Sequence, residues 1–166
     1  MPLEYQQEAH SEEVMVHLGE QFGNALNYSA SETETQVCAT VFFQGDLGMG
    51  KTTFTRGIMS YFGHKGATKS PTYTLVEPYQ FNEQNLNHFD LYRLGHPEEL
   101  DYLGIRDYFD GRSINLVEWP DKGRGFLPAA DITIEISPLE RGRSLRFIGN
   151  SVIGEAIIDA LKQERK

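Results

Sequence analysis

The feature that most constrains this chain is a glycine-rich segment of eight residues, set between a short apolar run and a helical one. Its residues are Gly45, Asp46, Leu47, Gly48, Met49, Gly50, Lys51 and Thr52. They match the pattern G-x-x-x-x-G-K-[ST] at every fixed position. The glycines let the backbone fold tightly, so that successive N–H groups converge on an anion, and the following helix directs its positive end to the same point. The segment therefore predicts a phosphate-binding loop.

Two side chains complete the chemistry of such a loop. Lys51 supplies a cation to the β- and γ-phosphates of a nucleotide, and the hydroxyl of Thr52 can ligate Mg²⁺. The predicted binding stretch extends from Gly45 to Thr53. Guanine-specific proteins of this kind carry an Asn-Lys-x-Asp element, which Asp121-Lys122 does not match. By elimination, ATP is favoured over GTP.

The remaining pattern predicts an α/β fold. Two runs, 37–44 and 113–119, are rich in β-branched and aromatic residues without polar alternation, as in strands buried on both faces. Further strands are expected at 72–81, 86–91, 131–136 and 145–148, and helices at 11–22, 51–61, 97–108 and 152–162, with a polar loop at 27–36. The order predicts a single P-loop NTPase-like domain over residues 1–166, with a mixed, mainly parallel central sheet flanked by helices.

Some local signals refine this expectation. Ser11 can cap the first helix, and Val14, Leu18 and Phe22 fall on one stripe of it. Pro78 favours an edge position or a bulge for its strand. Residues 1–10 match no motif.

Composition narrows the classes of partner. The 166 residues suit one domain, and no apolar run approaches the roughly 20 residues that cross a bilayer. The N-terminus lacks the features of a secretory signal, and the single cysteine, Cys38, excludes a disulfide within the chain, so a cytoplasmic protein is expected. The formal net charge of −9 argues against direct binding of DNA or RNA. The short basic group Arg141, Arg143 and Arg146 is interpreted as a solvated edge strand.

Two acids are candidates for the magnesium shell, because each ends an apolar strand. Either Asp90 or Glu118 could hold Mg²⁺, directly or through water, or polarise the attacking water. The alternative for Asp90 is a cap followed by an ion pair with Arg93. A buried Glu118 must have a partner in any case. Thr72 is a candidate for sensing the γ-phosphate, with a buried strand threonine as the alternative.

Several motifs stand in a defined order along the chain. They are Gly45-Asp-Leu-Gly-x-Gly-Lys-Thr-Thr53, Ser70-Pro-Thr-Tyr-Thr-Leu-Val76, His88-Phe-Asp-Leu-Tyr-Arg-Leu94, Glu118-Trp119 and Gly125-x-Leu-Pro128. In this combination the chain resembles the bacterial TsaE (YjeE) family over roughly residues 11–136.

The resemblance implies an ATPase of the machinery that places N6-threonylcarbamoyl on adenosine 37 of tRNA. Such a protein acts with the TsaB and TsaD proteins and meets tRNA only through that complex. Carried over by motif, Lys51 would hold the phosphates, Thr52 and Glu118 would ligate Mg²⁺, and Asp90 would serve in hydrolysis or in positioning the water. Thr72 would belong to a switch-like segment, and hydrolysis by the isolated chain would be slow.

Other residues and functions remain open at the level of sequence. No arginine stands out as one that would stabilise the charge of the transition state, although Arg93 and Arg106 could do so. His64, His88 and His96 lack metal-ligand spacing on one element. The alternative functions are a small-molecule P-loop kinase and a nucleotide-dependent adaptor without catalysis.

Overall fold

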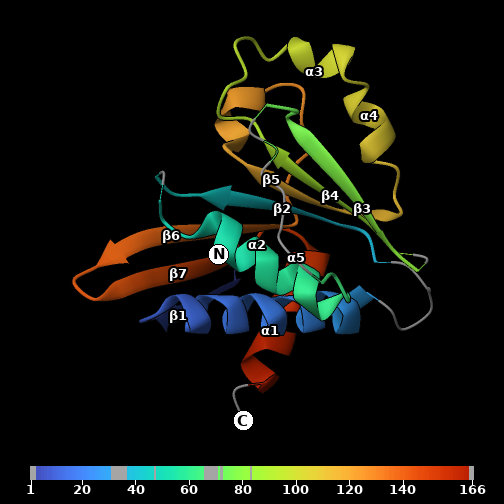
Figure 1. Cartoon of the computed structure of the whole chain (residues 1–166). Helices are drawn as coiled ribbons and strands as arrows, with labels where there is room; N and C mark the ends of the chain where they lie inside the picture. Colours follow the sequence, from blue (N-terminus) through green and yellow to red (C-terminus); the bar gives the residue numbers. More distant parts are fainter. Residues whose placement is uncertain are drawn as a thin grey trace.

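A seven-stranded sheet forms the centre of the molecule in the computed structural model, which describes residues 3–30, 37–46, 48–65, 71, 73–82 and 84–164 (Figure 1). The strands are β1 (Leu3–Ala9), β2 (Ala39–Gln44), β3 (Val76–Phe81), β4 (Gln84–Asp90), β5 (Ser113–Glu118), β6 (Ile132–Leu139) and β7 (Gly142–Gly149). Their order across the sheet is β1-β7-β6-β2-β5-β4-β3. The strands β6, β2, β5 and β4 pair in parallel, and β3, β7 and β1 add antiparallel pairs at the two sides. The predicted mixed sheet with a parallel centre is confirmed.

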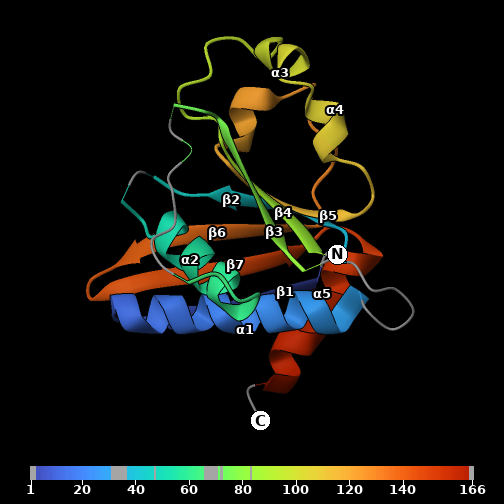
Figure 2. The same ribbon diagram turned by 45° about the vertical axis from the view of Figure 1, so that its right-hand side comes forward.

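Helices cover both faces of this sheet (Figure 2). They are α1 (Glu12–Ala30), α2 (Lys51–Tyr61), α3 (Glu99–Tyr102), α4 (Ile105–Tyr108), α5 (Val152–Glu164) and the 3₁₀ helix η1 (Pro120–Gly123). The three long helices α1, α2 and α5 lie on one face, and the short helices lie over the other. Within the described residues, no helix is both long enough and apolar enough to span a membrane.

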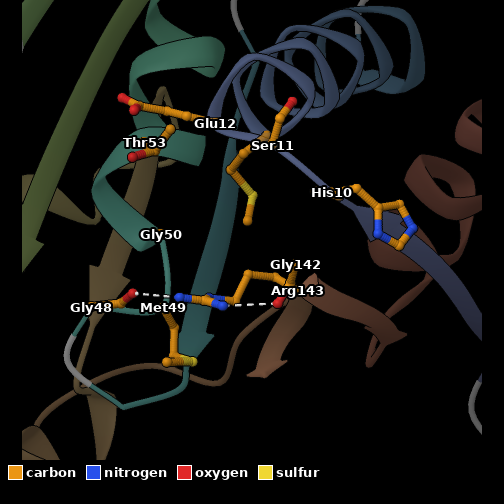
Figure 3. A pocket seen from close by; sticks show the side chains of 11 residues that line it. His10, Ser11, Glu12, Gly48, Met49, Gly50, Thr53, Gly142 and Arg143 are labelled. Atoms are coloured by element: carbon orange, nitrogen blue, oxygen red, sulfur yellow. Dashed lines mark hydrogen bonds between the residues drawn. The ribbon is translucent and has the colours of Figure 1, made fainter. Parts of the chain in front are cut away.

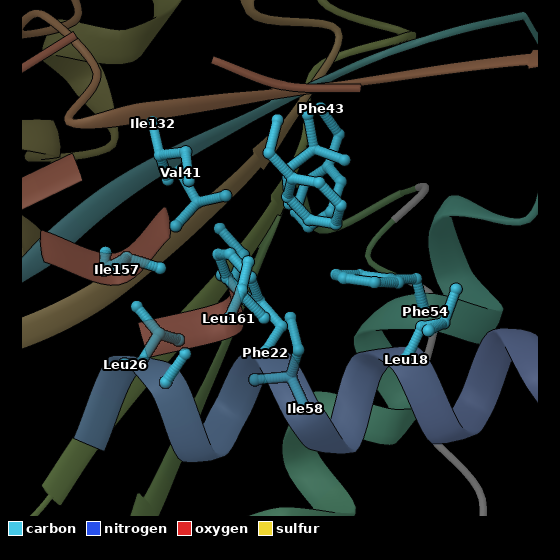
Figure 4. Close-up of a cluster of buried hydrophobic side chains, with 14 of the residues drawn as sticks. Leu18, Phe22, Leu26, Val41, Phe43, Phe54, Ile58, Ile132, Ile157 and Leu161 are labelled. Carbon is cyan, nitrogen blue, oxygen red and sulfur yellow. The ribbon is translucent and has the colours of Figure 1, made fainter. Parts of the chain in front are cut away.

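A cluster of aromatic rings fixes the start of α2 against the sheet. Phe54, one turn into α2, lies between Phe22 of α1 and Phe43 of β2, with ring centroids 5.6 and 5.9 Å away (Figure 4). All three side chains are fully buried. Burial of one such ring stabilises the fold by about 1.5–3 kcal/mol. Because Phe54 lies two residues after the glycine-rich segment, this packing also sets the position of the loop.

Helices α1 and α2 approach each other closely at two glycines. A Cβ atom on Gly57 would lie 2.1 Å from the carbonyl oxygen of Val16, and one on Gly19 would lie 2.2 Å from that of Phe54. Only glycine fits at such a crossing. The close approach brings the first turn of α1 next to the first turn of α2.

Several sequence expectations are corrected in the first third of the chain. Strand β1 was not predicted: its half-buried side chains Leu3 and Tyr5 pack on the core, but polar residues alternate with them. Helix α1 continues to Ala30, so residues 27–30 are helical and not loop. Ser11 does cap it, since its Oγ accepts a hydrogen bond from the Val14 N–H at 3.1 Å. Val14 itself is 39% exposed, and Met15 takes its place in the buried stripe.

Corrections elsewhere concern element ends and edges. Strand β3 begins at Val76, and it is an edge strand, as Pro78 indicated. The expected helix at 97–108 is broken into α3 and α4 because Gly104 adopts a left-handed conformation with φ 71°. The arginine-bearing strand β7 is not at an edge, since β1 pairs with its outer side.

Candidate functional site

The glycine-rich loop connects the end of β2 to the first residue of α2, as predicted. Gly50 caps α2 with φ 100°, and a Cβ atom there would meet the Cε of Met15 at 3.0 Å. Gly45 has φ 155°, and a Cβ atom there would lie 2.7 Å from the carbonyl oxygen of Ile136. Both positions therefore require glycine. Leu47 lies outside the described residues.

Lys51 lies at the base of this loop and is only 5% exposed. Its Nζ donates a hydrogen bond to the carbonyl oxygen of Gly45 at 2.7 Å and lies 4.0 Å from the centroid of the Trp119 ring. Burial lowers the pKa of Lys51, while the negative charges of Glu118, Asp90 and Asp46 act in the opposite direction. The loop lysine thus stands among three acids.

Asp90 and Glu118 end neighbouring parallel strands and are direct register partners. Alternation along the strands places both on the face that carries Leu86 and Leu116, which is the face covered by α2. Glu118 is 4% exposed, and Asp90 is half-buried. The structure therefore brings both predicted acids to the edge of the sheet where Lys51 lies.

The environment of Asp90 differs from a cap followed by an ion pair with Arg93. Its Oδ1 accepts a hydrogen bond from the Tyr92 N–H at 3.1 Å, which is the expected cap. Arg93, however, stacks on the ring of Tyr73 at 4.8 Å. Burial raises the pKa of Asp90, and the charge of Glu118 acts in the same direction, against the Tyr92 hydrogen bond and the charges of His88 and Lys51.

Glu118 has the partner that a buried carboxylate requires. The partner is His88 of β4, whose Nε2 lies 2.6 Å from the Glu118 Oε2. Sequence reasoning missed this role of His88, because the histidines of the chain lack metal-ligand spacing on one element. Its place two residues before Asp90, on the same face of a strand, is the signal that could have found it.

Oxygen ligands for a magnesium ion are available at this edge. They are the carboxylates of Glu118 and Asp90 and the hydroxyl of Thr52, which is exposed in the first turn of α2. Across the described part of the chain, no three His, Cys, Asp or Glu side chains form a cluster that could hold a metal. Mg²⁺ normally takes one or two carboxylates and completes its shell with phosphate and water, so this donor set fits it. Thr72 lies outside the described residues.

A cavity of about 380 Å³ adjoins the loop. Three segments line it: the end of β1 with the start of α1, the loop with the first turn of α2, and the start of β7 (Figure 3). Arg143 extends across it, and its Nη2 donates a hydrogen bond to the carbonyl oxygen of Gly48 at 3.4 Å. Lys51, Asp90 and Glu118 are not in the lining. The cavity is therefore an extension of the phosphate loop and not the place where the acids meet.

The parallel sheet centre, the glycine-rich loop and the helix after it define the P-loop class of nucleotide-binding fold. Residues 9–145 match the family model described as "Threonylcarbamoyl adenosine biosynthesis protein TsaE". The chain belongs to this family.

Individual similar proteins support the assignment to this family. The tRNA threonylcarbamoyladenosine biosynthesis protein TsaE of Haemophilus influenzae is 46% identical over 88% of this chain and 90% of its own length. The protein of the same name from Rickettsia bellii is 37% identical over 66% of this chain and 76% of its own. The crystal structure of Bacillus subtilis YdiB superposes with a TM-score of 0.80 at 23% identity, covering 100% of this chain and 99% of that one. The last comparison shows the shared fold.

Proposed function

We propose that this chain is a Mg²⁺-dependent ATPase that supports the formation of threonylcarbamoyladenosine in tRNA, acting with a TsaB–TsaD complex. The modification is supported by the family and by the names of the relatives. The ATPase activity rests on the site itself. A net charge of −9 suits a protein that meets tRNA through its partners.

The observation that carries the proposal is the convergence of one buried lysine and two strand-end acids at the start of α2. The negative charge of Glu118 acts on the pKa of both Lys51 and Asp90, so the three groups are close together. Together with the backbone N–H groups of the loop, Lys51 holds the β- and γ-phosphates. Thr52 and Glu118 would hold a magnesium ion, which would supply positive charge to the phosphates.

Asp90 acts on the attacking water. Its carboxylate is half-buried and lies beside Glu118, and its pKa is raised towards the range in which a carboxylate accepts a proton effectively. Asp90 therefore orients the water and accepts its proton. The exposed Arg93 and Arg106 have no place in this constellation, because Arg93 stacks on Tyr73 and Arg106 lies on α4. In this proposal a partner supplies additional positive charge for the transition state, and hydrolysis by the chain alone is therefore expected to be slow.

The nucleoside lies in the cavity beside the loop. The volume of this cavity, about 380 Å³, is within the range of small-molecule sites. Gly48 and Gly50 form one wall, so a nucleotide whose phosphates lie in the loop can extend directly into it. Arg143 and Ser11 offer polar contacts there.

The experiment is ATP hydrolysis by the purified protein, alone and with TsaB plus TsaD, with Lys51→Ala as the control. We expect slow hydrolysis alone, strong stimulation by the pair, and loss of both in the variant. Hydrolysis that persists in Lys51→Ala would reject the phosphate site. A complete lack of stimulation would favour the kinase or the adaptor instead.

A further inference from the structure

The side chain of His88 is fully buried directly beneath the acid that ends β5. Its Nε2 lies 2.6 Å from the Oε2 of Glu118. In the parallel register, His88 is opposite Leu116 and Asp90 is opposite Glu118. The imidazole therefore lies one pleat back from the edge of the sheet and reaches diagonally to the neighbouring strand.

The chemistry of this pair determines which atom carries the proton. An ionised carboxylate can only accept, so the Nε2 of His88 is the donor. Within the described residues, the Nδ1 of His88 is buried without a hydrogen-bond partner. Within the described residues, the hydrogen bond to Glu118 is thus the hydrogen bond of this buried ring, because Nδ1 has no partner there.

This contact constrains Glu118 in two ways. It compensates a carboxylate that is almost completely removed from water. It also engages one carboxylate oxygen from the side of β4, which leaves the other oxygen for a metal ion or a metal-bound water. Asp90 is the register partner of Glu118, and its like charge would otherwise favour rotation of the Glu118 carboxylate away from it.

We propose that His88 is a positioning residue, which fixes the orientation of the Glu118 carboxylate and thereby sets the affinity of the nucleotide complex for Mg²⁺. The inference rests on the proposed function, since it takes Glu118 as a magnesium ligand. Loss of a group that orients a metal ligand typically lowers metal affinity about 10–100-fold.

Two substitutions of similar polarity form a matched pair. In His88→Gln, the amide nitrogen reaches about as far as Nε2 and can still donate to Glu118. In His88→Asn, the side chain is one carbon shorter, and its amide nitrogen stands near the place of Nδ1. Both remove the aromatic ring, so a difference between them reports the hydrogen bond and not the packing.

The measurement is calorimetric titration of a non-hydrolysable ATP analogue into the full chain, over a series of Mg²⁺ concentrations and in EDTA. We expect His88→Asn to raise the Mg²⁺ concentration for half-maximal enhancement of nucleotide affinity about 10–100-fold. His88→Gln should stay within a few-fold of wild type, and both should match wild type in EDTA. In the Glu118→Gln background, His88→Asn should cause no additional loss.

Three outcomes would overturn the proposal: wild-type Mg²⁺ dependence in His88→Asn, equal losses in the two variants, or an equal loss of affinity with and without Mg²⁺. The last would mark a purely structural pair. If His88→Asn does not fold, His88→Gln is compared with Glu118→Gln, and a His88→Gln variant as deficient as Glu118→Gln rejects the positioning role. A wild-type protein that binds the analogue without any Mg²⁺ dependence would instead reject the proposed function, and this inference with it.

Discussion

The ammonium group of Lys51 lies 4.0 Å above the ring of Trp119, so the loop lysine contacts the residue that follows the metal-shell candidate Glu118. Trp119 adopts a left-handed conformation with φ 58°, which is unusual for a bulky residue. Its ring also lies 5.0 Å from that of Tyr92, just beyond Asp90. The contact joins the phosphate loop to the ends of both acid-bearing strands.

Trp119 is the one tryptophan in the chain, so its emission reports this site. We expect ATP to change that emission, because phosphate groups compete with the ring for the Lys51 ammonium. In Lys51→Ala the emission should differ from wild type before ATP is added and should not respond to it. Hydrolysis should fall about a hundredfold or more, as for loss of a group that stabilises transition-state charge. Lys162→Ala, at an exposed position of α5, is the control, and an ATP response of wild-type size in Lys51→Ala would contradict the assignment.

If Glu118 is a magnesium ligand, its loss should lower the rate of ATP hydrolysis more than the affinity for the nucleotide. In Glu118→Ala, Mg²⁺-dependent hydrolysis should fall more than nucleotide affinity, since the loop and Lys51 still hold the phosphates. The measurement is the affinity for ATP in EDTA and in Mg²⁺, beside the rate. Equal losses of affinity in both conditions would refute a metal role.

The cavity beside the loop predicts that one of its residues, Arg143, contributes to the binding of ATP but not to the binding of the triphosphate group alone. Arg143→Ala should weaken ATP binding about tenfold, as expected for one charged hydrogen bond, and should leave binding of inorganic tripolyphosphate nearly unchanged. Arg141→Ala is the matched control, because Arg141 is exposed and outside the cavity lining. If tripolyphosphate affinity fell as far as ATP affinity, Arg143 would act on the phosphates instead.

Where local signals are strong, the sequence predicted the structure closely. The helix expected at 51–61 has those bounds, because a glycine turn begins it and buried Phe54 anchors it. The two strands buried on both faces, β2 and β5, were predicted because their runs of β-branched and aromatic residues lack polar alternation. Asp90 and Glu118 were identified as a pair of strand-end acids, although their direct adjacency depends on the order of β4 and β5 in the sheet.

Features that depend on distant partners were missed. Strand β1 pairs with β7 at the other end of the chain, and its polar residues resemble a loop until that partner is known. The cavity unites 9–15, 48–53 and 142–143, which no local pattern connects. The contact between His88 and Glu118 follows from a parallel register that sequence alone does not fix.

The crossing of α1 and α2 predicts a large effect from a single methyl group. Gly57→Ala should lower the free energy of unfolding by about 3 kcal/mol or more, because its Cβ would lie 2.1 Å from a backbone oxygen that cannot move without the whole helix. Gly95→Ala is the control: its Cβ would have no neighbour closer than 3.7 Å, and a change within about 0.5 kcal/mol is expected. Urea unfolding of both variants measures the difference. A Gly57→Ala protein as stable as Gly95→Ala would show that the helices can separate at little cost.

The raised pKa of Asp90 predicts that the ionised carboxylate lowers the free energy of unfolding of the protein. Burial is the main cause, and the charge of Glu118 acts in the same direction. An acid whose pKa is higher in the folded than in the unfolded protein destabilises the fold when ionised. That cost is complete above the folded pKa and disappears below the unfolded one. Asp90→Asn cannot ionise, so its free energy of unfolding should exceed that of wild type near neutral pH.

The advantage of Asp90→Asn should shrink as the pH falls through the folded pKa of Asp90 towards the ordinary aspartate range near pH 4. Urea unfolding at about pH 7 and about pH 4 measures it, with Asp101→Asn on an exposed face of α3 as the control that should show no such trend. The same Asp90→Asn protein should still bind ATP, but it should hydrolyse ATP far more slowly than wild type. A variant less stable than wild type at neutral pH would contradict the prediction, because the attraction between Asp90 and Lys51 would then outweigh burial.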